Sequence, residues 1–187
     1  VEVVPVSVLL QTLAATGDGS ALGDVRFEYP VVAEAPRAVQ VVIDGENVRI
    51  SSSTGPTLPA DRWTRHVSAR VIGELPAPAG AEAGAATPEI AWDPTAIGEL
   101  QRASGVDGQP LNWTVAGVEA VPGGLRATVD LPEPSVVALV DAAVHLARLL
   151  DGSDALMLPA AAEALVLAAD LGGADTVEVL RRGAGPD

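Results

Sequence analysis

The chain has 187 residues, with 11 Lys+Arg against 25 Asp+Glu, so its formal net charge is −14. All 11 cations are arginines, and this acidic balance argues against binding to nucleic acid or to an anionic membrane surface. The chain has no cysteine, which excludes disulfides and thiol chemistry, while 48% hydrophobic residues suffice for one ordinary domain or two small ones.

The first 75 residues predict a helix followed by an antiparallel sheet. Apolar residues at helical spacing predict a helix from Pro5 to Ala15. Alternation of apolar and polar residues predicts strands at residues 25–29, 39–43, 48–50 and 65–71. Asp44-Gly45 is a strong hairpin-turn signal, and a loop rich in Pro, Gly and Ser is expected from Ser51 to Pro59.

Residues 76–108 are expected to form a linker, because 76–87 consist mainly of Pro, Ala and Gly. A short helix is predicted within this segment at 94–103. We therefore divide the chain into an N-terminal half, 1–75, this linker, and a C-terminal half, 109–187.

The C-terminal half again predicts one long helix with antiparallel strands. A hairpin is expected about Pro122-Gly123-Gly124, with strands at 115–121 and 125–131. Ser135 is placed to cap a helix from Val136 to Leu150. Two further strand-like runs follow, at 164–168 and 176–180.

One long helix wrapped by a curled antiparallel sheet is the hot-dog plan, and two such halves in tandem make a double hot dog. We therefore expect an α+β double hot-dog fold. A ferredoxin-like pair of α+β units is the alternative, because pattern alone does not fix the number of strands.

The predicted helix 136–150 carries the residues with the clearest chemical potential. Asp141 and His145 are four residues apart, hence on one face, with Val137 on the same stripe. A carboxyl on an apolar helix is partly desolvated, so Asp141 is a candidate general acid with His145 as its hydrogen-bonding neighbour. The alternative is a solvated polar stripe completed by Arg148, and the pattern alone favours it.

The other histidine, His66, stands near the start of a predicted strand, where a structural, hydrogen-bonded role is favoured over catalysis. Two histidines are too few for an all-histidine metal site, so no metal or other cofactor is expected. The three tryptophans are expected to anchor core edges or the interface between the halves. No basic leader precedes the first helix, so we expect no signal peptide and a chain that begins inside a longer gene product.

Several segments of the chain match known sequence motifs. The stretch Trp63-Thr64-Arg65-His66-Val67-Ser68-Ala69 is similar to the Trp-Thr-x-His-Ala-x-Gly strand of the dehydratase domains of modular polyketide synthases. Leu131-Pro132 followed by Val140-Asp141-Ala142-Ala143-Val144-His145 resembles their Leu-Pro…Leu-Asp-Ala-Ala-x-His/Gln segment. Val3-Val4-Pro5-Val6 is similar to the end of their His-x-x-x-Gly-x-x-x-x-Pro-Gly motif, and Met157-Leu158-Pro159 to the Leu-Pro before the following strand.

The resemblance implies a cytoplasmic double hot-dog enzyme that removes water by syn elimination from a 3-hydroxyacyl chain on an acyl carrier protein. Asp141 corresponds to the family aspartate that protonates the departing hydroxyl, and His145 to the His/Gln position beside it. Val137, Pro5 and Pro159 are expected along the substrate tunnel. Other domains of the synthase are expected partners, and a homodimer is considered because hot-dog domains often pair.

Two motifs depart from the family pattern. The family's catalytic histidine would fall before Val1, and the His-Pro ahead of the aspartate reads Val136-Val137. We therefore expect an N-terminally shortened segment with an incomplete first hot dog, or a degenerate copy with impaired activity. The alternatives are a non-catalytic structural or docking domain, an isomerase or cyclase that uses only the aspartate, and a free-standing acyl-binding module.

Acyl carrier proteins are generally acidic, so docking onto a chain with this negative charge would use a local arginine cluster. Arg62, Arg65 and Arg70 are predicted as this carrier-docking cluster. The alternative is that these three arginines only solubilise a strand edge.

Overall fold

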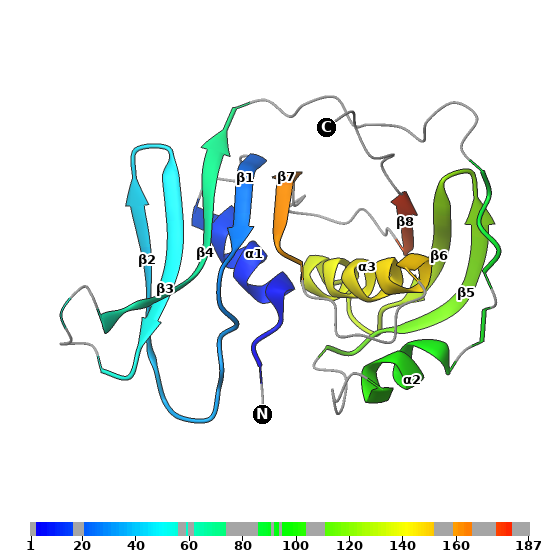
Figure 1. Cartoon of the computed structure of the whole chain (residues 1–187), viewed down its shortest axis with the longest axis horizontal. Helices are drawn as coiled ribbons and strands as arrows, with labels where there is room; N and C mark the ends of the chain where they lie inside the picture. The colour runs from blue at the N-terminus through cyan, green and yellow to red at the C-terminus, as the bar shows by residue number, and fades with distance from the viewer. Residues whose placement is uncertain are drawn as a thin grey trace. The chain divides into compact units, whose positions relative to one another are not determined.

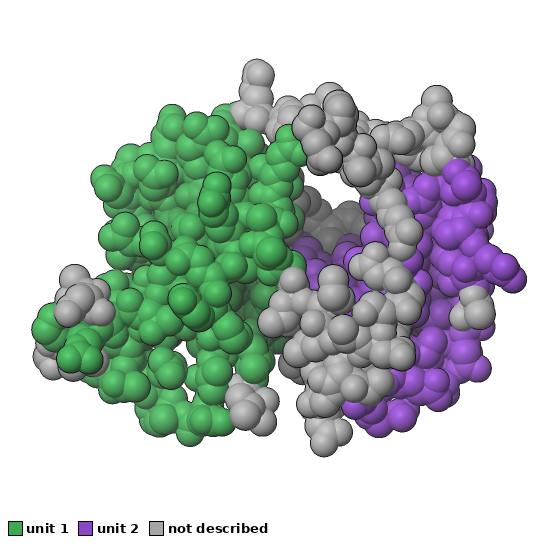
Figure 2. Space-filling model, viewed as in Figure 1, with its two compact units in different colours: residues 1–76, 159–169 green, residues 77–158, 170–187 purple. Residues whose placement is uncertain are grey.

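The computed structural model describes residues 3–16, 21–55, 59, 62–73, 86–90, 92–93, 95–103, 111–151, 159–165 and 175–180. The chain forms two compact units, shown in different colours in Figure 2. Unit 1 is Val1–Pro76 with Pro159–Ala169, and unit 2 is Ala77–Leu158 with Asp170–Asp187. Of the predicted linker, 76–108, the structure describes residues 86–90, 92–93 and 95–103, with a helix at Ala96–Ala103, and the boundaries of the linker stay a prediction.

Unit 1 consists of one helix on an antiparallel five-stranded sheet (Figure 1). The helix is α1 (Val6–Thr16), one residue further along the chain than predicted. The sheet has the order β2-β3-β4-β1-β7. Its strands are β1 (Ala21–Phe27), β2 (Ala38–Asp44), β3 (Asn47–Ser53), β4 (Thr64–Ile72) and β7 (Ala161–Leu165).

The core of unit 1 lies between α1 and the inner face of the sheet. Leu9, Leu10 and Leu13 are buried on α1, at the spacing that places them on one helical face. The helix contacts β3, where Val48 and Ile50 are buried at alternate positions. Arg49, which lies between them, is exposed and belongs to the opposite, outer face of the sheet.

The predicted β2–β3 hairpin is confirmed, with Gly45 at a positive φ of 59° in the turn. The predicted loop that begins at Ser51 is wrong at its start, because β3 continues through Ser53. Residues 51–53 are buried and pair with β2. The three serine residues therefore belong to the interior, where Ser52, the central one, forms a hydrogen bond with His66.

Strand β7 returns from the C-terminal part of the chain to unit 1. It pairs antiparallel with β1, with Leu22 opposite Leu165 and Arg26 opposite Ala161. It begins three residues before the predicted strand 164–168. The sheet of unit 1 is thus completed by residues that follow the long helix of unit 2 in sequence.

Unit 2 packs its long helix, α3 (Val136–Asp151), on a three-stranded antiparallel sheet of order β5-β6-β8. The short helix α2 (Ala96–Ala103) contacts α3. The strands are β5 (Thr114–Val121), β6 (Gly124–Asp130) and β8 (Thr176–Leu180). The predicted cap of α3 is confirmed, since the Ala138 amide donates to Ser135 Oγ at 3.2 Å.

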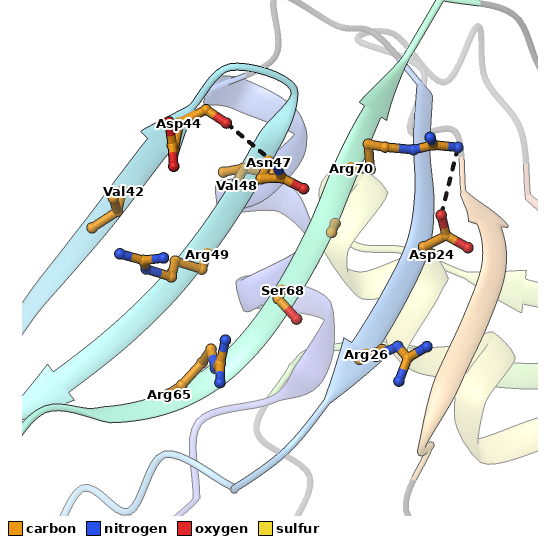
Figure 3. A pocket seen from close by; sticks show the side chains of 11 residues that line it. Asp24, Arg26, Val42, Asp44, Asn47, Val48, Arg49, Arg65, Ser68 and Arg70 are labelled. Atoms are coloured by element: carbon orange, nitrogen blue, oxygen red, sulfur yellow. Dashed lines mark hydrogen bonds and ion pairs between the residues drawn. The ribbon is translucent and has the colours of Figure 1, made fainter. Parts of the chain in front are cut away.

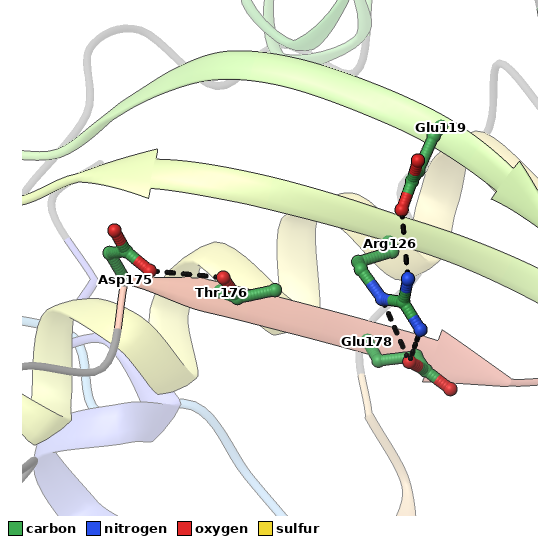
Figure 4. Close-up of polar contacts among 5 residues, drawn as sticks. All are labelled: Glu119, Arg126, Asp175, Thr176 and Glu178. Carbon is green, nitrogen blue, oxygen red and sulfur yellow. Dashed lines mark hydrogen bonds and ion pairs between the residues drawn. The ribbon is translucent and has the colours of Figure 1, made fainter.

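Two clusters of polar contacts lie on the surface of unit 2. Ahead of α2, the amide and hydroxyl of Thr95 donate to the Asp93 carboxylate at 2.7 and 2.6 Å and lower the pKa of Asp93. Across the sheet, Arg126 on β6 bonds Glu178 on β8 and Glu119 on β5, which raise the pKa of Arg126 (Figure 4). None of the helices in the described ranges is long and apolar enough to cross a membrane.

Candidate active site

The polar stripe of α3 is buried. Asp141 is 4% exposed and Arg148 7%, and the His145 side chain is 18% exposed. The interpretation of this face as solvated is therefore wrong. The physical reason is that Trp113, itself 3% exposed, packs against this face instead of water.

Trp113 holds the Asp141 side chain directly. The indole Nε1–H donates to Asp141 Oδ2 at 3.0 Å within the buried core of unit 2. The same indole ring lies 5.5 Å from the His145 ring, centroid to centroid, at a tilt of 56°. One aromatic residue, just ahead of β5, thus contacts both polar residues predicted for the site.

The contacts of His145 determine which of its nitrogens carries a proton. Its Nδ1 lies 2.9 Å from the backbone carbonyl oxygen of Asp141 and 3.7 Å from that residue's Oδ2. A carbonyl oxygen only accepts hydrogen bonds, so Nδ1 must donate. In the neutral ring Nε2 is then the acceptor, and it is the nitrogen that can take up a further proton.

This arrangement is suited to proton donation by a carboxyl group. Asp141 is buried, and the indole donor fixes the orientation of one of its carboxyl oxygens. A carboxylic acid held in this way can give its proton to an oxygen that leaves the substrate as part of water. Within the described residues, no group of three or more His, Asp or Glu side chains is placed to hold a metal ion.

His66 is held at both ring nitrogens and is 2% exposed. Nδ1 lies 2.9 Å from the Tyr29 carbonyl oxygen and therefore donates to it. Nε2 then accepts from the Ser52 hydroxyl at 2.7 Å, and Ser52 Oγ in turn accepts from Arg37 at 3.3 Å. The predicted structural role of His66 is confirmed, because its two nitrogens join the segment around Tyr29 to the sheet.

Curated relatives connect the chain to polyketide synthesis. A phenolphthiocerol/phthiocerol polyketide synthase protein of Mycobacterium tuberculosis (strain ATCC 25618 / H37Rv) is 40% identical over 202 aligned positions, which cover 100% of this chain and 11% of that protein. The 5-methyl-1-naphthoate synthase of Streptomyces sahachiroi is 32% identical over 135 positions, covering 62% of this chain and 7% of that protein. The chain thus spans only a small part of these relatives, and no family model matches it.

Solved structures identify the part concerned. The dehydratase domain from the terminal module of the rifamycin polyketide synthase has a TM-score of 0.62 at 25% identity, over 94% of this chain and 70% of that one. The erythromycin dehydratase gives 0.60 at 22% identity, over 99% and 73%. This chain has the fold of the dehydratase domains of polyketide synthases. A pyran synthase domain from module nine of the sorangicin pathway shares the fold, with a TM-score of 0.63 at 16% identity over 99% and 75%.

These neighbours confirm the α+β double hot-dog fold of the dehydratase domain, with the first hot dog incomplete. The expected tunnel residues are divided between the two units. Val137 is buried on α3, one turn before Asp141, whereas Pro5 precedes α1 and Pro159 precedes β7 in unit 1. The tunnel itself stays a prediction, and Met157 and Leu158 lie outside the described residues.

The predicted docking arginines of the dehydratase domain do not all lie together. Arg65 and Arg70 line a depression of about 320 Å³ on unit 1, whereas Arg62 is exposed and is not among its lining residues (Figure 3). The structure adds Arg26 from β1 and Arg49 from β3 to this depression.

Sequence reasoning missed Trp113, Arg26 and Arg49. Trp113 is 28 residues from Asp141, and no local pattern links an indole to a distant carboxyl group. The two arginines occupy outward positions on strands that were predicted, but the strand register is needed to bring them together.

Proposed function

We propose that this domain removes water from a 3-hydroxyacyl thioester carried on an acyl carrier protein, with Asp141 as the acid. The observation that carries the proposal is the buried Asp141 carboxyl, held by Trp113 on the central helix of a dehydratase-type fold. The fold likeness to dehydratase domains and the sequence likeness to a polyketide synthase support the same reaction class.

The proposed reaction is a syn elimination. A base removes the proton on C2, which the neighbouring thioester carbonyl acidifies, and that C–H electron pair becomes the C2=C3 double bond of the enoyl product. The C3–O bond breaks, and its electron pair leaves with the hydroxyl oxygen. Asp141 gives its proton to this oxygen, so that water departs and Asp141 is left as the carboxylate. By resemblance, the base is the family's catalytic histidine. That histidine opens the motif whose end Val3-Val4-Pro5-Val6 resembles.

His145 has a supporting role in this proposal. Its Nδ1–H is bonded to the backbone carbonyl of Asp141, so the ring is fixed one helical turn beyond the acid. Its Nε2 is the nitrogen able to exchange a hydrogen bond with the substrate or with water. The imidazole therefore fits the family's His/Gln position. Its role in the proposal is to orient the hydroxyl oxygen that Asp141 protonates.

The test uses a small, carrier-free 3-hydroxyacyl thioester and follows loss of water by mass spectrometry. Asp141→Asn should reduce turnover by about a hundred- to ten-thousand-fold, the usual effect of losing a positioned acid. Asp130→Asn is the matched control, because Asp130 is an exposed acid on β6 of the same unit. Equal turnover by the wild type and Asp141→Asn would overturn the role of Asp141.

The alternative functions need a second substrate beside this one. An isomerase or cyclase that uses only the aspartate is tested with an enoyl thioester that carries a distal hydroxyl group, because its double bond can migrate or accept that hydroxyl. Either product has the mass of its substrate and a different retention time; a pyran synthase domain shares the fold. A non-catalytic structural or docking domain, or a plain acyl-binding module, would return the substrate unchanged with wild type and Asp141→Asn alike.

A further inference from the structure

Four arginines gather on the outer face of the unit 1 sheet, opposite the face that packs on α1 (Figure 3). They line the depression of about 320 Å³, and we call them and the surface between them the arginine basin. All four side chains belong to exposed residues. The basin arginines are Arg26 on β1, Arg49 on β3, and Arg65 and Arg70 on β4.

The strand register places two of these arginines on either side of one serine. Ser68 of β4 is directly opposite Arg49 of β3 on one side and directly opposite Arg26 of β1 on the other. Neighbouring strands are about 4.8 Å apart, so the backbones of Arg26 and Arg49 are about 10 Å apart. In Figure 3, Arg49 and Arg26 lie on opposite sides of Ser68, and their guanidinium groups point away from it in opposite directions.

Within the basin, two arginines are neutralised and two are not. Arg65 forms an ion pair with Glu28 at 2.8 Å, and Arg70 with Asp24 at 3.5 Å. In the described part of the chain, neither Arg26 nor Arg49 makes a side-chain hydrogen bond or an ion pair. The chain has 25 acidic residues against 11 arginines, so two unneutralised neighbours stand out against the overall charge.

We propose that the arginine basin docks an acidic surface of a partner protein, with Arg26 and Arg49 as the anchoring contacts. The inference rests on the proposed function in one respect: the partner to be tested is the acyl carrier domain that would deliver the substrate. The proposed surface keeps Arg65 and Arg70 of the predicted cluster, leaves out Arg62, and adds Arg26 and Arg49 around Ser68.

The shape of the basin fits a protein surface better than a small anion. Its floor is a sheet face whose backbone N–H groups are used in the ladders of β3, β4 and β1. A small anion is usually held by converging backbone N–H groups, as at a helix N-terminus or a phosphate-binding loop. Exposed guanidinium groups spread over three strands instead match carboxylates spaced along a polypeptide.

Electrostatics would confine an acidic partner to this place. The net charge of −14 repels such a partner over most of the surface, so attraction is local to the basin. Asp24 and Asp44 stand at the end of the basin near Arg70, because Asp44 pairs with Asn47 and Asn47 with Arg70. These carboxylates would repel acidic groups at that end and so set the orientation of the docked partner.

The experiment measures binding of an apo acyl carrier domain, chosen for a negative net charge and lacking its phosphopantetheine, to the whole 187-residue chain by calorimetry at two salt concentrations. Arg26→Glu and Arg49→Glu should each weaken binding roughly tenfold, because each removes an attraction and adds a repulsion. The affinity of the wild type should fall as salt rises. Arg62→Glu is the matched control: it reverses an exposed arginine of the same unit outside the basin and should change the affinity by less than about twofold.

Three results would overturn the proposal. They are an equal loss with Arg62→Glu and Arg49→Glu, no measurable binding of the wild type, and displacement of the carrier by millimolar inorganic phosphate, which would indicate a small-anion site. Circular dichroism of each variant verifies folding, and Arg26→Gln and Arg49→Gln provide milder versions should charge reversal disturb the sheet. Loss of water from the carrier-free thioester by the wild type reports on the reaction separately, so docking and catalysis can fail independently.

Discussion

The Trp113 indole N–H and the Asp141 carboxyl group form a buried hydrogen bond of 3.0 Å that joins the residue just ahead of β5 to the middle of α3. This bond ties the orientation of the proposed acid to the packing of the unit 2 core, because Trp113 belongs to that core. Trp113 also contacts the His145 ring. We therefore regard Trp113 as a positioning residue for the two polar groups of α3.

Replacing Trp113 by phenylalanine keeps most of the ring but removes the N–H donor. A hydrogen bond to a charged group contributes about 1.5–3 kcal/mol, and the carboxylate that forms as Asp141 gives up its proton is such a group. The kcat for water loss from the carrier-free thioester should therefore fall about tenfold or more. KM should change little, since the lost contact orients the acid and not the acyl chain.

The matched control for Trp113→Phe is Trp92→Phe, because Trp92 packs against the same core. Steady-state kinetics of both variants, with thermal unfolding as a measure of folding, makes the comparison. Equal losses of kcat and of unfolding temperature in the two variants would show that Trp113 acts only as a core residue.

The site shows what sequence can and cannot predict. Asp141 and His145 were placed on one helical face because the 3.6-residue period fixes neighbours four apart, and α3 indeed runs one residue beyond its predicted end. That the face is buried depends on Trp113, which arrives from a different element. The pattern of the helix alone favoured a solvated stripe, since a polar stripe looks the same in either environment.

The fold likewise has strands that the sequence predicts and one whose position it does not predict. Strands such as β8, predicted at 176–180 and found there, follow from local alternation of apolar and polar residues. Strand β7 has an alanine-rich sequence with little strand preference, and its pairing with β1 spans most of the chain. Both its start and its partner are therefore decided by packing, which a local pattern does not contain.

The buried bond between Ser52 and His66 predicts a stability effect. Ser52→Ala leaves the buried His66 Nε2 without its donor and removes the acceptor of a partly buried hydrogen bond from Arg37. An unsatisfied buried polar group costs about 1–3 kcal/mol, so the free energy of unfolding should fall by about that amount in urea denaturation.

Ser51→Ala is the control for Ser52→Ala. Ser51 is also buried on β3, but in the described residues its side chain makes no hydrogen bond. Its replacement should change the free energy of unfolding by less than about 0.5 kcal/mol. A stability of Ser52→Ala equal to that of Ser51→Ala would contradict the proposed importance of the His66 network.

Gly124 predicts a second stability effect, because β8 approaches it too closely for a side chain. A Cβ atom at Gly124 would clash with the Val179 carbonyl oxygen and would lie 2.9 Å from Leu180 Cα. Both are backbone atoms of β8, which pairs with β6 here, so relief requires moving a strand. Gly124→Ala should destabilise unit 2 by about 1–3 kcal/mol or more.

Thermal unfolding of Gly124→Ala is best compared with Gly117→Ala. At Gly117 on β5 no atom outside its chain neighbours lies within 4 Å of the added Cβ, so this variant should unfold close to the wild-type temperature. If the two variants unfolded at the same temperature, the pairing of β8 against β6 at Gly124 would be wrong.

The Arg126 cluster predicts a salt-dependent contribution to the unit 2 sheet (Figure 4). Arg126 donates to Glu119 at 2.9 Å and to Glu178 at 2.9 and 3.1 Å, so one guanidinium on β6 bridges both neighbouring strands. Arg126→Met keeps the aliphatic stem but leaves the two glutamates, one on each side of β6, without the cation that they share. Arg126→Met should lower the urea midpoint at low salt, and the difference from the wild type should shrink in 1 M NaCl, where the Debye length is about 3 Å.

The control for Arg126→Met is Arg102→Met. Arg102 is an exposed arginine of α2 that has no ion pair among the described residues, so its replacement should leave the urea midpoint unchanged at both salt concentrations. A loss with Arg126→Met that persists undiminished in 1 M NaCl would show that packing of the stem, and not charge, links the three strands.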